Sequence, residues 1–250
     1  MPILILLACV GLLAGVGISA IGPGGVLSTI GLFLFTDLEP ATISGTAMVT
    51  QLLAGTLGAL AFTRSGHLQE PSTLRTAIIL LTTALLGTPL GVLFNSFLSV
   101  RMFGILLAGF VTLAAVLVWL RHRKTVEESD STKQPSQMAL ITLGFAIAIA
   151  SGMFGVGGPL LTVPVFVALG MPLLPVLAAA QLQSIAIAAV GSIAYITIDA
   201  VDWWLALIVG IPQALGVLIG WKVARTVPAK YLRSAMIIIL LAIAPFLAFR

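Results

Sequence analysis

Eight long apolar segments make up most of this 250-residue chain. A helix of about 20 apolar residues crosses the hydrocarbon core of a bilayer, whereas membrane-spanning strands alternate apolar and polar residues. Only 8% of the residues are charged, against about 25% in a typical soluble domain. The sequence therefore predicts an all-α polytopic integral membrane protein with about eight transmembrane segments, at approximately residues 3–35, 41–63, 73–97, 101–120, 137–170, 173–198, 203–224 and 229–249.

A polar stretch at residues 122–136 divides the chain into two halves of four segments each. When residue n is paired with residue n + 133, the pattern G-x-G-G-x-L-x-T recurs. Identical residues then pair at these positions of the first half: Gly22, Gly24, Gly25, Leu27, Thr29, Phe33, Ala47, Gly58 and Ala61. We interpret residues 1–121 and 137–250 as two homologous transmembrane repeats joined by a polar cytoplasmic linker.

The first apolar segment of each half is too long for one straight crossing. Residues 3–35 would form a helix of about 50 Å, but the hydrocarbon core is only about 30 Å thick. Each long segment contains a glycine-rich stretch, GPGGVLSTIG at 22–31 and GVGGPLLTVP at 155–164. We therefore predict that each repeat opens with a glycine-broken helix.

The positions of the basic residues favour an inverted arrangement of the two repeats. If every segment crosses the membrane, the twelve Lys and Arg residues divide seven to five between the two sides. If each first segment instead returns to the side where it enters, ten of them share one side, in the loops 64–75, 121–136 and 222–233. Positive charge accumulates on the cytoplasmic side, so the re-entrant, inverted arrangement is favoured.

The two glycine stretches are candidates for a binding site. Unwound backbone inside a bilayer is tolerated where it is buried in protein or lines a cavity, and matching breaks in two repeats typically mark a transporter site. The free N–H groups and positive end of a helix that starts there attract an anion. The alternative is that small residues allow close helix packing. The candidate binding residues are Gly22, Gly24, Gly25, Val26, Gly155, Gly157, Gly158, Pro159 and Leu160.

Polar residues in the segment after each break extend this candidate site. Gln51 and Ser184 pair under the offset of 133, and both lie about 15 Å along their helices, near the middle of the bilayer. Gln181 and Ser184 are three residues apart and share a helix face. The alternative role for these groups is hydrogen bonding between helices. The polar candidates for substrate binding are Thr46, Thr50, Gln51, Gln181, Gln183 and Ser184.

The sequence gives no sign of catalytic, metal or nucleic-acid chemistry. All eight acidic residues lie in or beside loops, no basic or histidine residue falls at a predicted membrane midplane, and Cys9 is the single cysteine. We therefore expect no enzyme activity, no cofactor, no metal and no nucleic-acid partner. A site without fixed charge suits an anion that is held by backbone dipoles.

These motifs resemble those of the sulfite exporter TauE/SafE family of membrane permeases. The resemblance rests on GPGGVLSTIGLFLF with SGTAMVTQLLAGTLGAL in the first half, and on GVGGPLLTVPVFVALG with AAAQLQSIAIAAVGSIAYI in the second. The closing segment LGVLIGWKVARTVPAKYLRSAMIIILLAI is also similar to that of the family. Two departures bear on substrate choice: Pro23 lies inside the first glycine motif, and AAAQ opens the second-half helix where the first half has Gly45 and Thr46.

The resemblance implies a multi-pass permease or exporter of the inner membrane. Its expected partners are the lipid bilayer and a small anion such as sulfite, a sulfonate, or a related organosulfur or carboxylate anion. The residues do not specify which anion, the direction of transport, a coupling ion or the oligomeric state. A non-transporting membrane assembly or accessory protein is the alternative, although such a protein would not need duplicated helix breaks.

Overall fold

The structure is a computed structural model that describes residues 2–20, 22–63, 70–124, 135–226 and 229–250. These residues form ten α-helices and one short 3-10 helix. In chain order they are α1 (Pro2–Ala20), η1 (Pro23–Gly25), α2 (Val26–Phe35), α3 (Pro40–Thr63), α4 (Pro71–Asn95), α5 (Val100–Lys124), α6 (Gln137–Phe154), α7 (Pro159–Ala168), α8 (Leu173–Thr197), α9 (Trp203–Thr226) and α10 (Ala229–Phe249).

Several helices in the described residues have the length and composition of membrane spans. Six of them, α1, α4, α5, α6, α8 and α9, contain an apolar stretch long enough to cross a bilayer. Local signals set some of their ends. The side chain of Ser136 accepts a hydrogen bond from Ala139 N at 3.2 Å and caps the start of α6, as expected for serine at this position. Pro71 starts α4, where its missing N–H leaves no hydrogen bond unmade.

Each of the two long first segments consists of two helices. In the segment 3–35, α1 ends at Ala20 and the chain continues as η1 and α2. In the segment 137–170, α6 ends at Phe154 and the chain continues as α7. Gly22 has a φ of 104° and Gly155 a φ of 67°, in the left-handed region that favours glycine. Helices α2 and α7 have ten residues each, which corresponds to about 15 Å and half a bilayer core.

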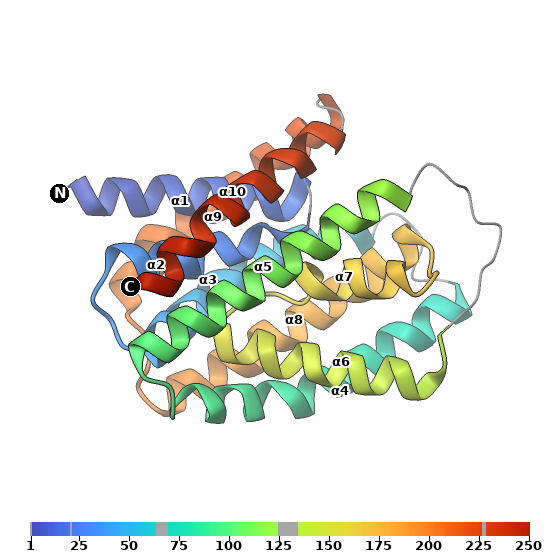
Figure 1. The fold of residues 1–250 in the computed structure, drawn as a ribbon, viewed down its shortest axis with the longest axis horizontal. Coiled ribbons are helices and arrows are strands. Elements are labelled where there is room, and N and C mark those ends of the chain that lie inside the picture. The colour runs from blue at the N-terminus through green and yellow to red at the C-terminus, as the bar shows by residue number, and fades with distance from the viewer. Residues whose placement is uncertain (1, 21, 64–69, 125–134, 227–228) are drawn as a thin grey trace.

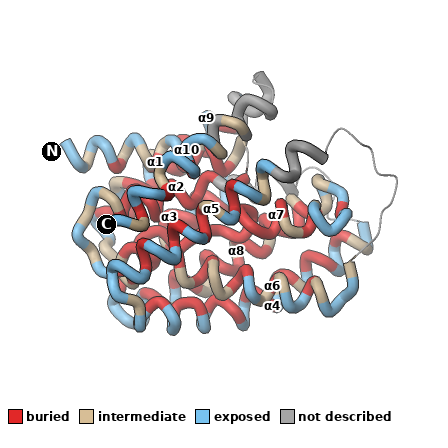
Figure 2. The backbone as a smooth tube through the Cα atoms, in the orientation of Figure 1, coloured by how far each residue is buried: buried red, intermediate tan, exposed pale blue. Residues whose placement is uncertain are grey.

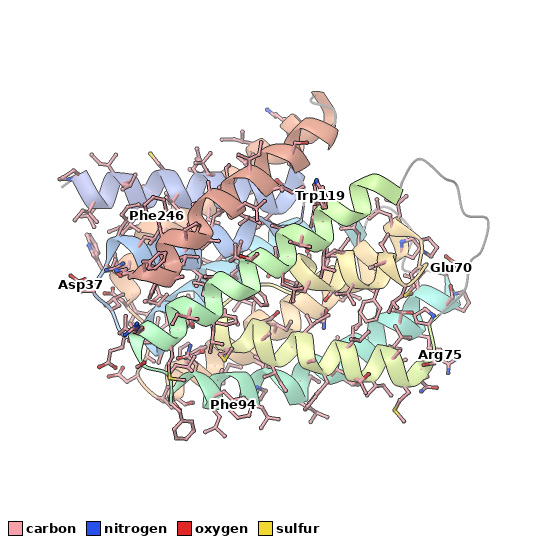
Figure 3. All side chains as sticks on the ribbon, in the orientation of Figure 1. Asp37, Glu70, Arg75, Phe94, Trp119 and Phe246 are labelled. Carbon is pink, nitrogen blue, oxygen red and sulfur yellow. The ribbon has the colours of Figure 1, made fainter. Side chains whose placement is uncertain are left out.

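Both broken segments fold back on themselves (Figure 1). Helix α1 runs away from the end of the molecule that holds both termini, and α2 returns toward that end. Helix α6 starts at the opposite end, and α7 returns to it. We call these the Asp37 end and the Arg75 end, after residues that mark them in Figure 3. Arg250 pairs with Asp37 at 3.0 Å, and Arg75 donates to the Gln137 side chain at 2.8 Å.

The two halves pack against each other through matching helix pairs. Helix α1 lies along α9, and α6, its counterpart in the second half, lies along α4. Helices α3 and α8 contact each other, as do α5 and α10. Glycines allow the close approach in both of the first two pairs, because a β-carbon on Gly11 or on Gly91 would meet backbone atoms of Val209 or Ile149. The halves therefore interlock rather than sit side by side.

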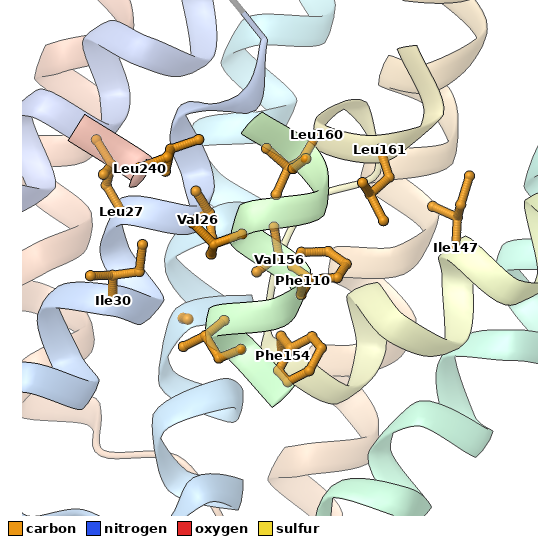
Figure 4. Close-up of a cluster of buried hydrophobic side chains, with 14 of the residues drawn as sticks. Val26, Leu27, Ile30, Phe110, Ile147, Phe154, Val156, Leu160, Leu161 and Leu240 are labelled. Carbon is orange, nitrogen blue, oxygen red and sulfur yellow. The ribbon is translucent and has the colours of Figure 1, made fainter. Parts of the chain in front are cut away.

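A buried apolar core surrounds the two short helices. Figure 4 shows Val26 and Leu27 of α2 and Leu160 and Leu161 of α7 within this cluster. Phe154 also belongs to this cluster, and the centroid of its ring lies 4.9 Å from that of Phe110. Large apolar side chains also cover the outside, including Leu86, Phe97 and Phe246, and exposed positions follow the outer faces of the helices in Figure 2. This distribution suits a lipid-facing surface.

Candidate functional site

A small cavity lies where the two helix breaks meet. Both breaks line it, together with α1, α3 and α8, through Ile18, Gly22, Gly25, Gln51, Gly55, Val156, Gly157, Pro159, Gln181 and Ser184. The volume open to the centre of a water molecule is about 10 Å³, which is room for about one water. The site is therefore nearly closed in this conformation.

Two glutamine side chains point unpaired donors at this region. Gln51 and Gln181 are each only 3% exposed. The Nε2 atom of each is buried and has no hydrogen-bond partner in the structure. An unsatisfied buried donor costs about 1–3 kcal/mol, so a site that keeps two of them beside one cavity has donors available to a ligand.

The glycines of the breaks separate into two groups by what they contact. Gly25 lies against the amide group of Gln51. A β-carbon on Gly157 would lie 2.7 Å from Ser184 Oγ, and one on Gly158 would lie 3.0 Å from Gln183 Oε1. By contrast, a β-carbon on Gly24 would meet the backbone of α1, and one on Gly155 would meet the backbone at Ser44. The first group leaves space beside polar side chains, whereas the second allows close helix packing.

The helices that leave the breaks add backbone donors. Gly25 and Gly158 occupy the N-cap positions of α2 and α7, and glycine offers no side-chain acceptor to the first-turn N–H groups. Those groups and the positive ends of the two helices favour an anion. The side chains of Val26 and Leu160 are buried in the core. Leu160 can contribute only through its backbone, and the Val26 N–H bonds the Gly24 carbonyl.

Three of the predicted polar residues do not line the cavity. Gln183 uses both ends of its amide, since Oε1 accepts from Thr162 at 2.6 Å and Nε2 donates to the Gly144 carbonyl at 3.4 Å. Thr50 donates to the Ala47 carbonyl within its own helix at 2.8 Å. The hydroxyl of Thr46 accepts from the backbone N–H of Asp202 at 3.0 Å. These bonds connect helices or satisfy the side chain locally.

Polar side chains that sequence reasoning missed hold the carbonyl end of α6. Asn95 Nδ2 donates to the Met153 carbonyl and to Ser44 Oγ, and Ser44 donates to the same carbonyl at 2.9 Å. Tyr195 donates to the Gly152 carbonyl at 2.9 Å. These bonds satisfy carbonyls that lack partners at a helix end. In the sequence, Asn95 lies near the end of the apolar segment 73–97, a position that indicates a loop residue.

The described lining of the site is uncharged. No Lys, Arg, His, Asp or Glu is among the described residues that line the cavity. Within the described part of the chain, no group of His, Cys, Asp and Glu residues is arranged to hold a metal ion. Any attraction for a charged ligand here comes from amide groups, a hydroxyl and helix ends.

Known proteins are similar to this chain in sequence. The sequence profile of the family described as "Sulfite exporter TauE/SafE" matches residues 7–247. The chain is 28% identical over 229 residues to the "Probable membrane transporter protein YdhB" of Bacillus subtilis (strain 168), covering 90% of this chain and 91% of that protein. It is 27% identical over 200 residues to a "Probable membrane transporter protein" of Xylella fastidiosa (strain 9a5c), covering 78% and 75% of the two chains. No solved structure matches significantly.

The apolar helices and these relatives define a multi-pass membrane protein of a transporter class. More particularly, the chain belongs to the sulfite exporter TauE/SafE family. The family resemblance seen in the glycine motifs is thereby confirmed.

Proposed function

We propose that this protein is an inner-membrane permease for small anions, of the sulfite, sulfonate or related organosulfur and carboxylate class, and that substrate binds in the cavity between the two helix breaks. The observation that carries the proposal is the pair of unpaired Nε2 donors of Gln51 and Gln181 beside a cavity whose described lining residues are all uncharged. Ser184 and the first-turn N–H groups of α2 and α7 complete a set of neutral donors.

A neutral shell of donors suits transport better than a fixed positive charge. A hydrogen bond to a charged ligand contributes about 1.5–3 kcal/mol, so a few donors can select an anion. An ion that moves through a site must also leave it, which requires binding that is not too tight. Amide groups and helix ends meet both requirements.

The helix packing supports the proposal that residues 1–121 and 137–250 are homologous, inverted repeats. In chain order, α1 of the first half corresponds to α6 of the second, and α4 corresponds to α9. Exchange of the two halves therefore turns the contact α1–α9 into the contact α6–α4, and both contacts are present. The broken segments enter from opposite ends and return to them (Figure 1). Most of the linker 122–136, residues 125–134, lies outside the described residues. Alternating access would follow from rocking of one repeat against the other around the shared cavity.

Orientation follows from charge. We place the Arg75 end in the cytoplasm, because the loops assigned to that end hold ten of the twelve basic residues. Single cysteines at Gln137 and Trp203, both exposed, in a Cys9→Ser background should react with a membrane-impermeant maleimide from inside and from outside, respectively. Labelling of both positions from one side would contradict the inverted arrangement.

Binding and flux in proteoliposomes test the function. The purified protein should bind and move at least one of sulfite, a small sulfonate or a small carboxylate. Gln51→Ala and Gln181→Ala should each weaken its apparent affinity by about 10- to 100-fold, since each removes one donor to a charged ligand. Ser192→Ala is the matched control, because Ser192 is also buried and unpaired on α8 but does not line the cavity.

The outcomes separate the two functions that the sequence leaves open. If no tested anion is bound or moved by the wild type, the permease proposal fails and an assembly or accessory role is favoured. If anions are moved but neither glutamine variant changes affinity, the cavity is not the binding site.

A further inference from the structure

A third unpaired amide lies outside the cavity. Gln213 of α9 is fully buried, and its Nε2 atom has no hydrogen-bond partner. Its Oε1 atom accepts from Ser28 Oγ at 2.9 Å. Gln213 was not among the residues that the sequence suggested, although it lies at the midpoint of the apolar segment 203–224, where an amide is costly.

The position of Gln213 relative to the cavity follows from its contact with α2. Gly25 lines the cavity and lies against Gln51. Gly25 is the N-cap of α2, and Ser28, which bonds Gln213, lies three residues further along the chain in the first turn of α2, or about 4.5 Å away. Helix α2 runs from the break toward the Asp37 end (Figure 1). Gln213 therefore lies about one helical turn from the cavity, on its Asp37 side.

A purely structural glutamine would use both ends of its amide. Gln183 does so, bonding Thr162 through Oε1 and Gly144 through Nε2. Gln213 bonds one helix through its oxygen and leaves its nitrogen free, as Gln51 and Gln181 leave theirs. The Ser28 hydroxyl holds the oxygen in place and so directs the two N–H donors away from it. The first turn of α2, which contains Ser28, supplies a positive helix end beside the same amide.

We propose that Gln213 is a second anion-binding amide, one helical turn beyond the central cavity, that receives the substrate as it passes between the cavity and the Asp37 end. This inference rests on the proposed permease function and adds a step to it. Passage through a membrane protein is faster when an ion moves between neighbouring weak sites than when it leaves one strong site. Gln51 and Gln181 would set affinity, and Gln213 would set the rate of passage.

Gln213→Met is the test variant, because methionine has a similar length and no donor. We expect the maximal anion flux to fall about 10-fold or more, by loss of one donor to a charged ligand, while the apparent affinity stays within about 2-fold of wild type. Thermal stability should stay equal or rise, because the change removes an unpaired buried donor. Gln213→Asn keeps the amide group and should restore part of the flux.

Thr88→Val is the matched control. Thr88 occupies the position of Gln213 when the repeated LGVL at 90–93 and 215–218 is aligned, and its hydroxyl is also buried without a partner. This variant should keep wild-type flux. The inference is overturned if Gln213→Met transports at the wild-type rate, or if its flux falls only in step with stability and folded yield.

Failure of this inference differs from failure of the proposed function. If the wild type moves anions and Gln51→Ala weakens their binding, while Gln213→Met behaves like wild type, only the second site is excluded. If the wild type moves none of the tested anions, the permease function itself fails, and with it the second site.

Discussion

The two helix breaks share a sequence motif but are held in different ways. In each, the N–H of the first glycine bonds the carbonyl four residues before it, Gly22 to Ile18 and Gly155 to Ser151. At the second break, side chains from α4, α3, α8 and α2 bond the end of α6: Asn95, Ser44, Tyr195 and Thr29. At the first break, backbone packs on backbone, as Gly24 does on α1.

The counterpart of Asn95 explains part of this difference. With LGVL aligned, Asn95 corresponds to Gly220. Asn95 bonds the end of α6, whereas Gly220 packs directly against Val16 and Ser19 of α1. Side-chain hydrogen bonds fix a helix end in one geometry, but a glycine contact adds no directional bond to it. We therefore expect the α6–α7 break to stay fixed during transport and the α1–α2 break to move.

The matched glycines Gly24 and Gly157 should give the largest difference between the breaks. In Gly24→Ala the new β-carbon meets the backbone of Ala14, Gly17 and Ile18, which cannot move aside. We expect a loss of about 3 kcal/mol or more in stability and little folded protein by size-exclusion chromatography. Gly109→Ala is the control, because a β-carbon there meets no atom within 4 Å.

Gly157→Ala should instead fold and bind poorly. Its β-carbon would lie 2.7 Å from Ser184 Oγ and 3.4 Å from Gln51 Oε1, and both are ends of side chains that can rotate. The added methyl group occupies a cavity with room for about one water. We expect near-normal folded yield and anion affinity lowered about 10- to 100-fold. Equal losses of yield in the two variants would remove the distinction between the breaks.

The main features of the fold could be predicted from the sequence because they depend on local composition. Apolar runs give the helices, and glycines in the left-handed region give the breaks at Gly22 and Gly155. The paired offset also led to Gln51 and Ser184, and a shared helix face led to Gln181; all three line one cavity. The division of 3–35 at the glycine stretch was predicted, whereas the 3-10 turn Pro23–Gly25 that precedes α2 was not.

The rest of the site depends on which helices become neighbours. Gln183 and Gln181 look alike in the sequence, but only Gln183 faces Thr162 and Gly144. Asn95 and Tyr195 approach α6 only after α4 and α8 pack on it. Ile18, Gly55 and Val156 line the cavity without any distinctive residue type. Such roles follow from tertiary packing, which periodicity and motif spacing do not specify.

Asn95→Leu should loosen the second break with an intermediate effect. The variant removes the donor that Asn95 Nδ2 supplies to Met153 and Ser44, while Ser44 still donates to the Met153 carbonyl. We expect a loss of about 1–3 kcal/mol in unfolding free energy, measured by chemical denaturation in detergent. Hydrogen exchange should rise at residues 150–156 and stay unchanged at 16–20. Faster exchange confined to α1 would contradict the assignment of the fixed break.

Tyr195→Phe should produce the smallest effect, and that effect should be confined to the Gly152 carbonyl. Tyr195 is fully buried, and its hydroxyl donates to the Gly152 carbonyl at 2.9 Å. Phenylalanine keeps the ring packing and removes one neutral hydrogen bond, which contributes about 0.5–1.5 kcal/mol. The Gly152 carbonyl loses that donor, but the Met153 carbonyl keeps both of its donors. We therefore expect stability to fall within this range and anion affinity to stay within about 2-fold of wild type. A larger change in affinity than in stability would mean that Tyr195 acts on the substrate site itself, and that the fixed break is part of binding rather than its support.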